Sequence, residues 1–363
     1  MRFGHMPLNT MNNKLVIFFA AIVLLAFGCH HNNEQVNISI SPEAGSAYKA
    51  GDVVNVKVGL PSDAKVDSIV YLIDSTRFVS RKDSAALSLK TDSMPLGIKL
   101  ITARVYQGAT KQEVSTNILL LAAKAPEKYT FKVVKVFPHD TSSYTEGLLY
   151  QDGFLYESSG GTVTEGIGQS SLRKVELNTG KVVQKAMLDP KIFGEGISIV
   201  GNKIYMMTWT TKIGYVYDKD SFKLLNTYTD SVGIEGWGLC FDGNKLYKDD
   251  SSNRVWFIDK NKWKATGHID VCDNTRQIDS LNELEYIGGK LYANVYTQNY
   301  ILIIDPKTGT VLGTIDLSPL VAENHKNANA DVLNGIAYDA KTNRIFITGK
   351  KWPHLYQVEF VKE

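Results

Sequence analysis

Five segments of the chain share one pattern, and this repeat constrains the fold more than any other feature of the sequence. Each segment opens with a polar residue, usually followed by glycine. It continues as an apolar run, turns at Gly or Asn, and enters a second run that opens Leu-Tyr, Ile-Tyr or Ile-Phe, or Phe-Leu-Tyr in the first segment. The segments begin at Glu146, Glu195, Glu235, Asn282 and Asn334, at spacings of 49, 40, 47 and 52 residues. Repeats of about 40–50 residues with four strands each are typical of propeller blades. The repeat therefore predicts a five-bladed β-propeller.

The last repeat is one strand short. It has strand-like runs near residues 334–339, 344–349 and 354–360, after which the printed chain ends. The run YTFKVVKVF, residues 129–137, directly precedes the first repeat. We expect this run to supply the fourth strand of the last blade, because closing a ring removes exposed sheet edges. The propeller is therefore expected to span residues 125–363.

Residues 37–124 do not share the repeat and have a different pattern of apolar runs and turns. Short alternating runs such as VNVKVGL and STNILLLAA are separated by turn signals, with no helical period. This pattern favours a small immunoglobulin-like β-sandwich in front of the propeller, so the expected fold class is all-β. No chemistry is apparent in this part, and one alternative is a structural adaptor that docks a partner.

The N-terminal residues have the pattern of a targeting segment. Lys14 precedes the apolar run 15–27, which ends at Gly28-Cys29, and the charged region reads better from Met11. LLAFGC resembles a bacterial lipoprotein signal, so residues 1–29 are expected to be a signal peptide with Cys29 as the lipidation site, followed by a tether at 30–36. An ordinary signal peptide with an incidental cysteine is the alternative. Either way we expect an exported protein, and the lipidated form would be held at the bacterial cell envelope by its lipid anchor alone.

Composition and cysteine usage exclude several classes of function. The net charge of +2 argues against a nucleic-acid-binding surface. Cys240 and Cys272 belong to no CxxC pair and lie in or beside runs of apolar residues, so both are expected to be buried free thiols. The histidines have no metal-ligand spacing. We therefore expect a monomer without a metal or another cofactor.

The propeller pattern brings particular side chains to one end of the central channel. The first strand of a blade starts at the face to which the second strand returns, so the five opening residues should meet the residues that end the second strands. Those ending residues are Gly160, Trp209, Ser251, Tyr296 and Lys350, and Trp237 lies close to Glu235. Carboxylates, amides, a lysine and aromatic rings in one concavity are typical of a small-molecule site. Glu195, between two glycines, is the favoured functional residue over a simple turn carboxylate, whereas Glu235 and Asn334 are expected to tie loops to the backbone.

The motifs on this frame match a known family. YTEGLLY, LYESSG, FGEGI, EGWGL, LNELEYI, LYANVY, IDPKTGTVLGTIDL, DVLNGIAYD and TGKKWP occur in order over residues 128–360. Together they resemble the plant- and bacterial-type glutaminyl cyclases. The resemblance implies a five-bladed propeller that converts the N-terminal glutamine of peptides or proteins to pyroglutamate and releases ammonia.

The resemblance also implies roles for individual residues. Glu195 of FGEGI falls on the family's acid/base glutamate, Asn282 of LNELEY on its active-site asparagine and Lys350 of TGKKWP on its lysine. Trp209 and Trp237 fall on pocket tryptophans. Two substrate-binding positions depart from the family: Glu146 in YTEGL replaces the usual Gln, and Tyr296 replaces the usual Trp.

These residue types suit the chemistry that the resemblance implies. One carboxyl, Glu195, can carry the proton from the attacking amine to the leaving nitrogen if its pKa lies near the working pH. Lys350 and Asn282 can donate to the amide oxygen as negative charge builds there. The alternative is a non-catalytic propeller lipoprotein that binds exported peptides or glycans, which would have no need of Glu195 and Lys350 together.

Overall fold

The computed structural model describes residues 37–363 of the 363-residue chain. The expected signal peptide, the tether and Cys29 lie outside the described residues. Nearly all the regular structure is β-strand, as the repeat predicts. None of the described helices is long and apolar enough to cross a membrane.

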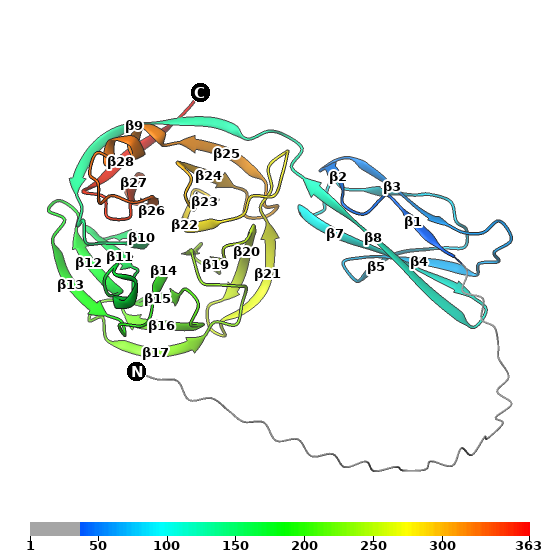
Figure 1. The fold of residues 1–363 in the computed structure, drawn as a ribbon, viewed down its shortest axis with the longest axis horizontal. Helices are drawn as coiled ribbons and strands as arrows, with labels where there is room; N and C mark the ends of the chain where they lie inside the picture. The colour runs from blue at the N-terminus through cyan, green and yellow to red at the C-terminus, as the bar shows by residue number, and fades with distance from the viewer. Residues whose placement is uncertain (1–36) are drawn as a thin grey trace, which may run out of the picture. The chain divides into compact units, whose positions relative to one another are not determined.

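Five blades surround a common centre (Figure 1). Three are separate four-stranded sheets, and two more lie within one eight-stranded sheet. Blade one is formed by β10 (Thr145–Gln151), β11 (Phe154–Ser159), β12 (Ser171–Glu176) and β13 (Val182–Met187). Blade two is formed by β14 (Gly194–Val200), β15 (Lys203–Thr208), β16 (Ile213–Asp218) and β17 (Leu224–Thr229). Blade three is formed by β18 (Leu239–Phe241), β19 (Leu246–Asp249), β20 (Arg254–Asp259) and β21 (Lys264–Asp270).

The last two blades complete the ring. Blade four is formed by β22 (Leu281–Ile287), β23 (Lys290–Val295), β24 (Tyr300–Ile304) and β25 (Val311–Asp316). Blade five is formed by β26 (Leu333–Asp339), β27 (Arg344–Gly349), β28 (His354–Lys362) and β9 (Glu127–Pro138). The innermost strands contact one another in the order β10, β14, β18, β22 and β26, and β26 contacts β10. The five-bladed propeller is therefore confirmed.

The expected closure by the segment before the first repeat is also confirmed. β9 pairs antiparallel with β28, from His354 opposite Pro138 to Lys362 opposite Tyr129. The start of β9 additionally pairs in parallel with β25, where Glu127 lies opposite Gly313. The sequence did not predict this second pairing, which joins blades four and five into one sheet.

Local sequence explains the hairpins and the packing between blades. Asp152 and Gly153 connect β10 to β11 with φ angles of 52° and 89°. Positive φ at both positions is required by the tight turn that matches the twist of antiparallel strands. Between blades one and two, the buried side chains of Tyr156 and Leu172 pack with those of Ile197 and Met206. Such clusters between neighbouring blades hold the inner strands in place.

Residues before β9 form two further sheets. One has the order β1 (Ser39–Ser41), β3 (Val53–Gly59) and β6 (Leu87–Lys90). The other has the order β2 (Ser46–Lys49), β8 (Thr110–Leu121), β7 (Gly97–Gln107), β4 (Ser68–Ile73) and β5 (Thr76–Arg81). Both sheets contribute to one buried cluster that includes Val56, Leu89, Ile69 and Ile101. That residues 37–124 form an immunoglobulin-like domain of their own stays a prediction.

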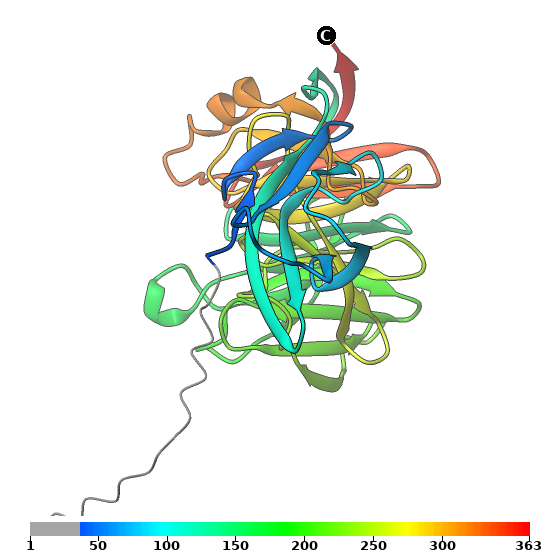
Figure 2. The ribbon, with the colours of Figure 1, turned by 90° about the vertical axis from the view of Figure 1, so that its right-hand side faces the viewer.

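Two short helical segments interrupt the blades. The 3₁₀ helix η1 (Val163–Glu165) lies between β11 and β12, and α1 (Ser318–Asn324) lies between β25 and β26. Figure 2 shows the propeller edge-on, with η1 in green and α1 in orange projecting on the same side. The loops that carry these helices therefore rise above one face of the propeller.

Candidate active site

The seven residues to which the resemblance gives catalytic or substrate-binding roles line one cavity of about 230 Å³, which we call the mouth pocket. Four other residues expected at this end of the channel are not among its lining: Gly160, Glu235, Ser251 and Asn334. Its lining residues come from all five blades and from the η1 loop: Tyr144, Glu146, Glu165, Ile167, Phe193, Glu195, Trp209, Trp237, Asn282, Tyr296 and Lys350. The structure thus brings together the seven residues that were given roles in the site. Tyr144, Glu165, Ile167 and Phe193 were missed, since they lie outside the repeated positions.

The opening residues reach this pocket through irregularities in the strands. The ladder between the first two strands shifts register at Glu146 in blade one, at Glu195 in blade two and at Asn282 in blade four. An extra residue in one strand of a pair bends the strand and re-aims its side chain, and such bulges are frequent next to active sites. Lys350 reaches the mouth pocket from the end of a second strand, because it directly follows the last residue of β27. Glu195 of FGEGI is therefore a bulge residue whose side chain lines the mouth pocket.

The glycines on either side of Glu195 serve the packing around this strand. A Cβ on Gly196 would lie 2.4 Å from the Trp237 carbonyl oxygen, and one on Gly194 would lie 2.5 Å from the Met206 Cε. Gly196 N–H also donates to the Trp237 carbonyl at 2.8 Å. The inner strands of blades two and three thus approach too closely for a side chain at Gly196, whereas Gly194 leaves room for the end of the Met206 side chain.

Blade three differs from the sequence alignment of the repeats. The pairing of Leu239 with Lys248 matches that of Ile197 with Met206 in blade two, so Trp237 holds the position that Glu195 holds there. Glu235 lies two residues earlier, and placing it at the opening position was wrong. The cause is the insertion in EGWGL, which moves the start of the strand.

Glu235 orients the aromatic wall of the mouth pocket. Its Oε2 accepts hydrogen bonds from the indole Nε1 of Trp209 at 2.9 Å and of Trp237 at 2.8 Å. The Trp237 ring meets that of Tyr296 edge-on, with centroids 5.6 Å apart. One carboxylate therefore fixes two tryptophans, whereas we expected it to bind backbone. Two indoles within reach of one acid could not be read from the sequence, because Trp209 and Glu235 belong to different blades.

Lys350 and Glu146 form a buried ion pair inside the mouth pocket. Lys350 Nζ donates to Glu146 Oε1 at 2.6 Å, and the two side chains are 4% and 2% exposed. The amide of Asn334 donates to the other Glu146 oxygen at 3.2 Å and to the Thr145 carbonyl at 2.9 Å. Asn334 therefore binds backbone, as expected, and also holds the Glu146 carboxylate. The Lys350 ammonium lies 4.5 Å from the Tyr144 ring centroid, within cation–π range.

Glu195 is 5% exposed, and no protein group within residues 37–363 donates a hydrogen bond to its carboxylate. Burial raises the pKa of Glu195 well above its usual range, the Glu146 charge raises it further, and Lys350 opposes both. Burial likewise raises the pKa of Glu146 to about 7 against the charge of Lys350. Burial alone would lower the pKa of Lys350, but the charges of Glu146 and Glu195 outweigh it and raise that pKa. The mouth pocket thus holds an unpartnered acid beside a cation that keeps its proton.

Asn282 adds an amide to the same pocket. The residue is 3% exposed, and its Oδ1 is buried without a hydrogen-bond partner among the described residues. A buried polar atom left without a partner is costly, and such atoms are often satisfied by a ligand or by water. Asn282 is therefore available to a bound molecule, as an acceptor through Oδ1 and as a donor through Nδ2, which donates to no other described residue.

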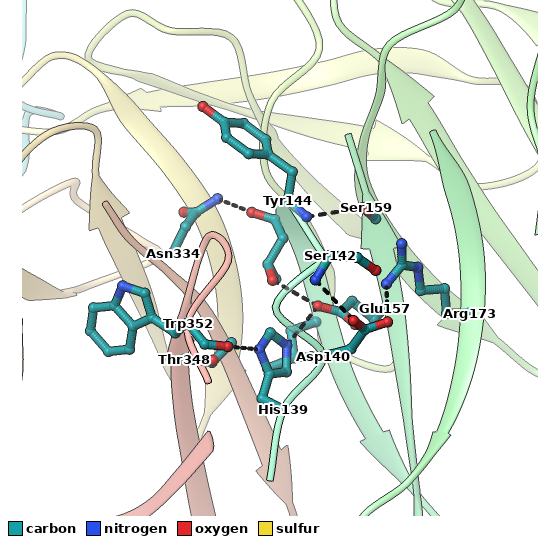
Figure 3. Close-up of polar contacts among 12 residues, drawn as sticks. His139, Asp140, Ser142, Tyr144, Glu157, Ser159, Arg173, Asn334, Thr348 and Trp352 are labelled. Carbon is teal, nitrogen blue, oxygen red and sulfur yellow. Dashed lines mark hydrogen bonds and ion pairs between the residues drawn. The ribbon is translucent and has the colours of Figure 1, made fainter. Parts of the chain in front are cut away.

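A second buried ion pair, His139–Glu157, lies next to the segments that carry Glu146 and Lys350 (Figure 3). His139 contacts the Trp352 carbonyl through Nδ1 at 2.7 Å and Glu157 Oε1 through Nε2 at 3.0 Å. The Thr145 hydroxyl donates to the same Glu157 oxygen at 2.7 Å. Thr145 precedes Glu146, and Trp352 lies two residues beyond Lys350. His139 therefore connects the two segments that carry the Lys350–Glu146 pair.

Within residues 37–363, no group of three or more His, Cys, Asp or Glu side chains is arranged to hold a metal ion. Cys240 and Cys272 are buried and free, as expected.

Comparisons with known proteins agree with the geometry. A model of the glutamine cyclotransferase family matches residues 100–360. The glutaminyl-peptide cyclotransferase of Arabidopsis thaliana is 39% identical over 231 residues, which cover 63% of this chain and 70% of that protein. The crystal structure of the Myxococcus xanthus glutaminyl cyclase superposes with a TM-score of 0.60 at 33% identity, covering 66% of this chain and 99% of that one.

Proposed function

The chain belongs to the glutamine cyclotransferase family, and on that premise we propose that the mouth pocket cyclises the N-terminal glutamine of peptides or proteins to pyroglutamate. The α-amine attacks the γ-carboxamide carbon, a five-membered ring closes through the new C–N bond, and the carboxamide nitrogen leaves as ammonia. The single observation that carries this assignment is the unpartnered, buried Glu195 beside Lys350 and Asn282 in a chain of this family.

Glu195 moves the proton. Its ionised form accepts a proton from the amine as the C–N bond forms, and its protonated form delivers that proton to the leaving nitrogen. One group serves in both directions when its pKa lies near the working pH, and burial raises the pKa of Glu195 toward that range. Because no group of residues 37–363 donates a hydrogen bond to this carboxylate, both oxygens are free to meet the substrate.

Lys350, through its ammonium, and Asn282, through Nδ2, donate to the oxygen of the carboxamide. Negative charge develops on this oxygen as the amine adds, and a prepositioned donor there is worth roughly 3 kcal/mol. Lys350 uses one N–H on Glu146 and keeps two others. The Glu146 charge raises the pKa of Lys350, so the ammonium persists through the reaction.

The aromatic residues hold the glutamine in a cyclic conformation. A free glutamine side chain samples many rotamers, and ring closure needs the amine and the amide carbon in contact. Trp209, Trp237 and Tyr296 line the mouth pocket, and the tryptophans are fixed by Glu235. A rigid wall lowers the entropy that must be lost in the transition state.

Incubation with glutaminyl-alanine amide tests the proposed activity. The enzyme should release one ammonia for each pyroglutamyl product formed, measured by coupled ammonia assay and mass spectrometry. A peptide-binding propeller without catalytic activity would bind the dipeptide and release no ammonia.

We also propose that the reaction needs no metal ion. Support comes from the residues themselves: Glu195 can transfer the proton, and Lys350 can supply the positive charge for the oxygen. Activity should therefore persist after treatment with EDTA. Inactivation that zinc reverses would contradict this proposal.

Finally, we propose that the protein is exported and anchored by a lipid on Cys29, which rests on the LLAFGC motif alone. The full chain expressed in a bacterium should fractionate with membranes, and Cys29→Ala should shift it to the soluble fraction. Wild-type protein in the soluble fraction would instead indicate an ordinary signal peptide.

A further inference from the structure

A second cavity, of about 440 Å³, adjoins the mouth pocket, and we call it the basic cavity. Ile167 lines both. Lys351 lines the basic cavity and directly follows Lys350 of the mouth pocket, so their Cα atoms are about 3.8 Å apart. Gly160 also lines it, and a Cβ there would lie 2.7 Å from Glu146 Cγ. The two spaces are therefore neighbours across a thin wall.

The basic cavity is named for its charges. Arg173, Lys185 and Lys351 line it, and no carboxylate is among its lining residues. Arg173 on β12 lies directly opposite Lys185 on β13, where like charges destabilise a sheet. Burial and then the Arg173 charge lower the pKa of Lys185. Two acids outside the lining act on Arg173: Asp140 pairs with it at 3.0 Å, and Glu157 lies opposite it on β11 while pairing with His139. Because the His139 charge compensates Glu157, Asp140 alone stands against the three cations of the cavity, which leaves an excess of positive charge.

Arg173 offers an unused edge to this space. Its side chain is 3% exposed, with Nε donating to Ser171 at 3.0 Å and Nη1 donating to Asp140. No hydrogen bond from Nη2 to another described residue is present. In Figure 3 one terminal nitrogen of Arg173 points toward Asp140 and the other points away from it. A buried guanidinium with free donors at a cavity is suited to a carboxylate, whose two oxygens match its planar geometry.

We propose that the basic cavity binds a carboxylate carried by the second or third residue of the substrate, so that the protein prefers peptides with an acidic residue soon after the N-terminal glutamine. This inference rests on the proposed cyclase activity. An extended chain advances about 3.3–3.6 Å per residue. From a glutamine held beside Lys350, the next one or two residues therefore have the reach to meet Lys351 and the basic cavity.

Peptide amides that differ at one position test this preference. Gln-Glu-Ala amide and Gln-Ala-Glu amide are compared with Gln-Ala-Ala amide and Gln-Lys-Ala amide. The better glutamate peptide should exceed the lysine peptide about tenfold in kcat/KM, mainly through KM, because a hydrogen-bonded charge is worth about that much. Gln-Ala as free acid and as amide distinguishes a terminal carboxylate from a side-chain carboxylate as the bound group.

Charge reversal within the basic cavity should remove the preference. Lys185→Glu and Lys351→Glu should each lower kcat/KM for the glutamate peptide about tenfold and leave that for Gln-Ala-Ala amide within twofold. Lys223→Glu is the matched control, since this exposed lysine before β17 lines neither cavity. Equal kcat/KM for all peptides, with Gln-Ala-Ala amide turned over, would overturn the inference and leave the proposed function intact. Absence of turnover with every peptide would overturn both.

Discussion

At the scale of single residues, the mouth pocket separates two carboxylates by the partners that each receives. Glu146 is held by Lys350 and Asn334, whereas Glu195 accepts no hydrogen bond from the described protein groups. Burial raises the pKa of both. The Glu146 carboxylate therefore fixes the Lys350 ammonium, whereas the Glu195 carboxylate is free for proton transfer.

Glu146→Gln should move the pH optimum of activity downward. The Glu146 charge raises the pKa of Glu195, so its removal lets Glu195 ionise at lower pH. The acidic limb of the kcat/KM profile, which follows ionisation of the base, should therefore shift to lower pH in the variant. Profiles that coincide, or an optimum that rises, would show that Glu146 does not act on Glu195.

Lys350→Ala should reduce kcat on the order of 10²-fold, because it removes a donor to the developing oxyanion. The single variant also leaves Glu146 buried without its cation. The double variant Glu146→Gln/Lys350→Ala avoids this and should show the same loss in steady-state kinetics. An increase in KM with kcat unchanged would make Lys350 a binding residue only.

At the scale of elements, the pair His139–Glu157 links the end of β9 to β11 and to the turn after β27. Although burial by itself opposes ionisation, the charges of His139 and Arg173 hold the pKa of Glu157 at about 2. Burial lowers the pKa of His139, but the Glu157 charge outweighs it and the net pKa is raised. The pair is therefore charged near neutral pH and belongs to the frame of the site.

Glu157→Gln should lower the free energy of unfolding by roughly 3–5 kcal/mol near pH 6, since it leaves a buried partner uncompensated. The contribution of Glu157 is present above its ordinary pKa of about 4.3 and is lost as pH falls toward 2. That of His139 is present below about 6.5 and is lost as pH rises through its raised pKa.

Urea denaturation at pH 2.5, 6 and 9 should therefore show the largest difference between wild type and variant at pH 6. Glu323→Gln, which breaks the exposed pair with Lys326, is the control and should cost less than about 1 kcal/mol. A constant difference at all three pH values would mean that Glu157 stabilises through packing alone.

The repeat predicted elements well where residues act locally. Apolar runs and Gly or Asn turns sufficed for the blades, and a common offset to the second strand aligned Glu146, Glu195 and Asn282. The bulges at these positions were not predicted. The prediction for blade three was wrong because EGWGL adds residues before β18. Trp237, and not Glu235, therefore holds the opening position of that blade. The partners of His139 and Glu235 were out of reach, since such contacts join residues on different blades. The parallel pairing of β9 with β25 could not be predicted either, because nothing in the sequence of either strand indicates its partner.

At the scale of the whole molecule, the ring depends on a strand that comes from before the first repeat. β9 pairs with β28 along nearly its full length and with the end of β25. The strand thus connects the first segment of the propeller to its last blade, and its loss would expose the edge of β28.

A truncated chain covering residues 125–363 should fold and retain activity, because it keeps β9 and all the lining residues of the mouth pocket. Removing residues 129–137 as well should abolish cooperative unfolding and activity. Circular dichroism during thermal unfolding and the ammonia assay provide the measurements. An active, folded protein without residues 129–137 would contradict the closure.

The most direct test of the central claim is the turnover of Glu195→Gln with glutaminyl-alanine amide. The substitution keeps the size of the side chain and removes its capacity to carry a proton, so the fold and KM should be little changed. We predict that kcat falls by at least about 10²-fold, consistent with loss of general acid–base catalysis. A loss of less than tenfold in a normally folded variant would contradict the account and assign proton transfer to another group.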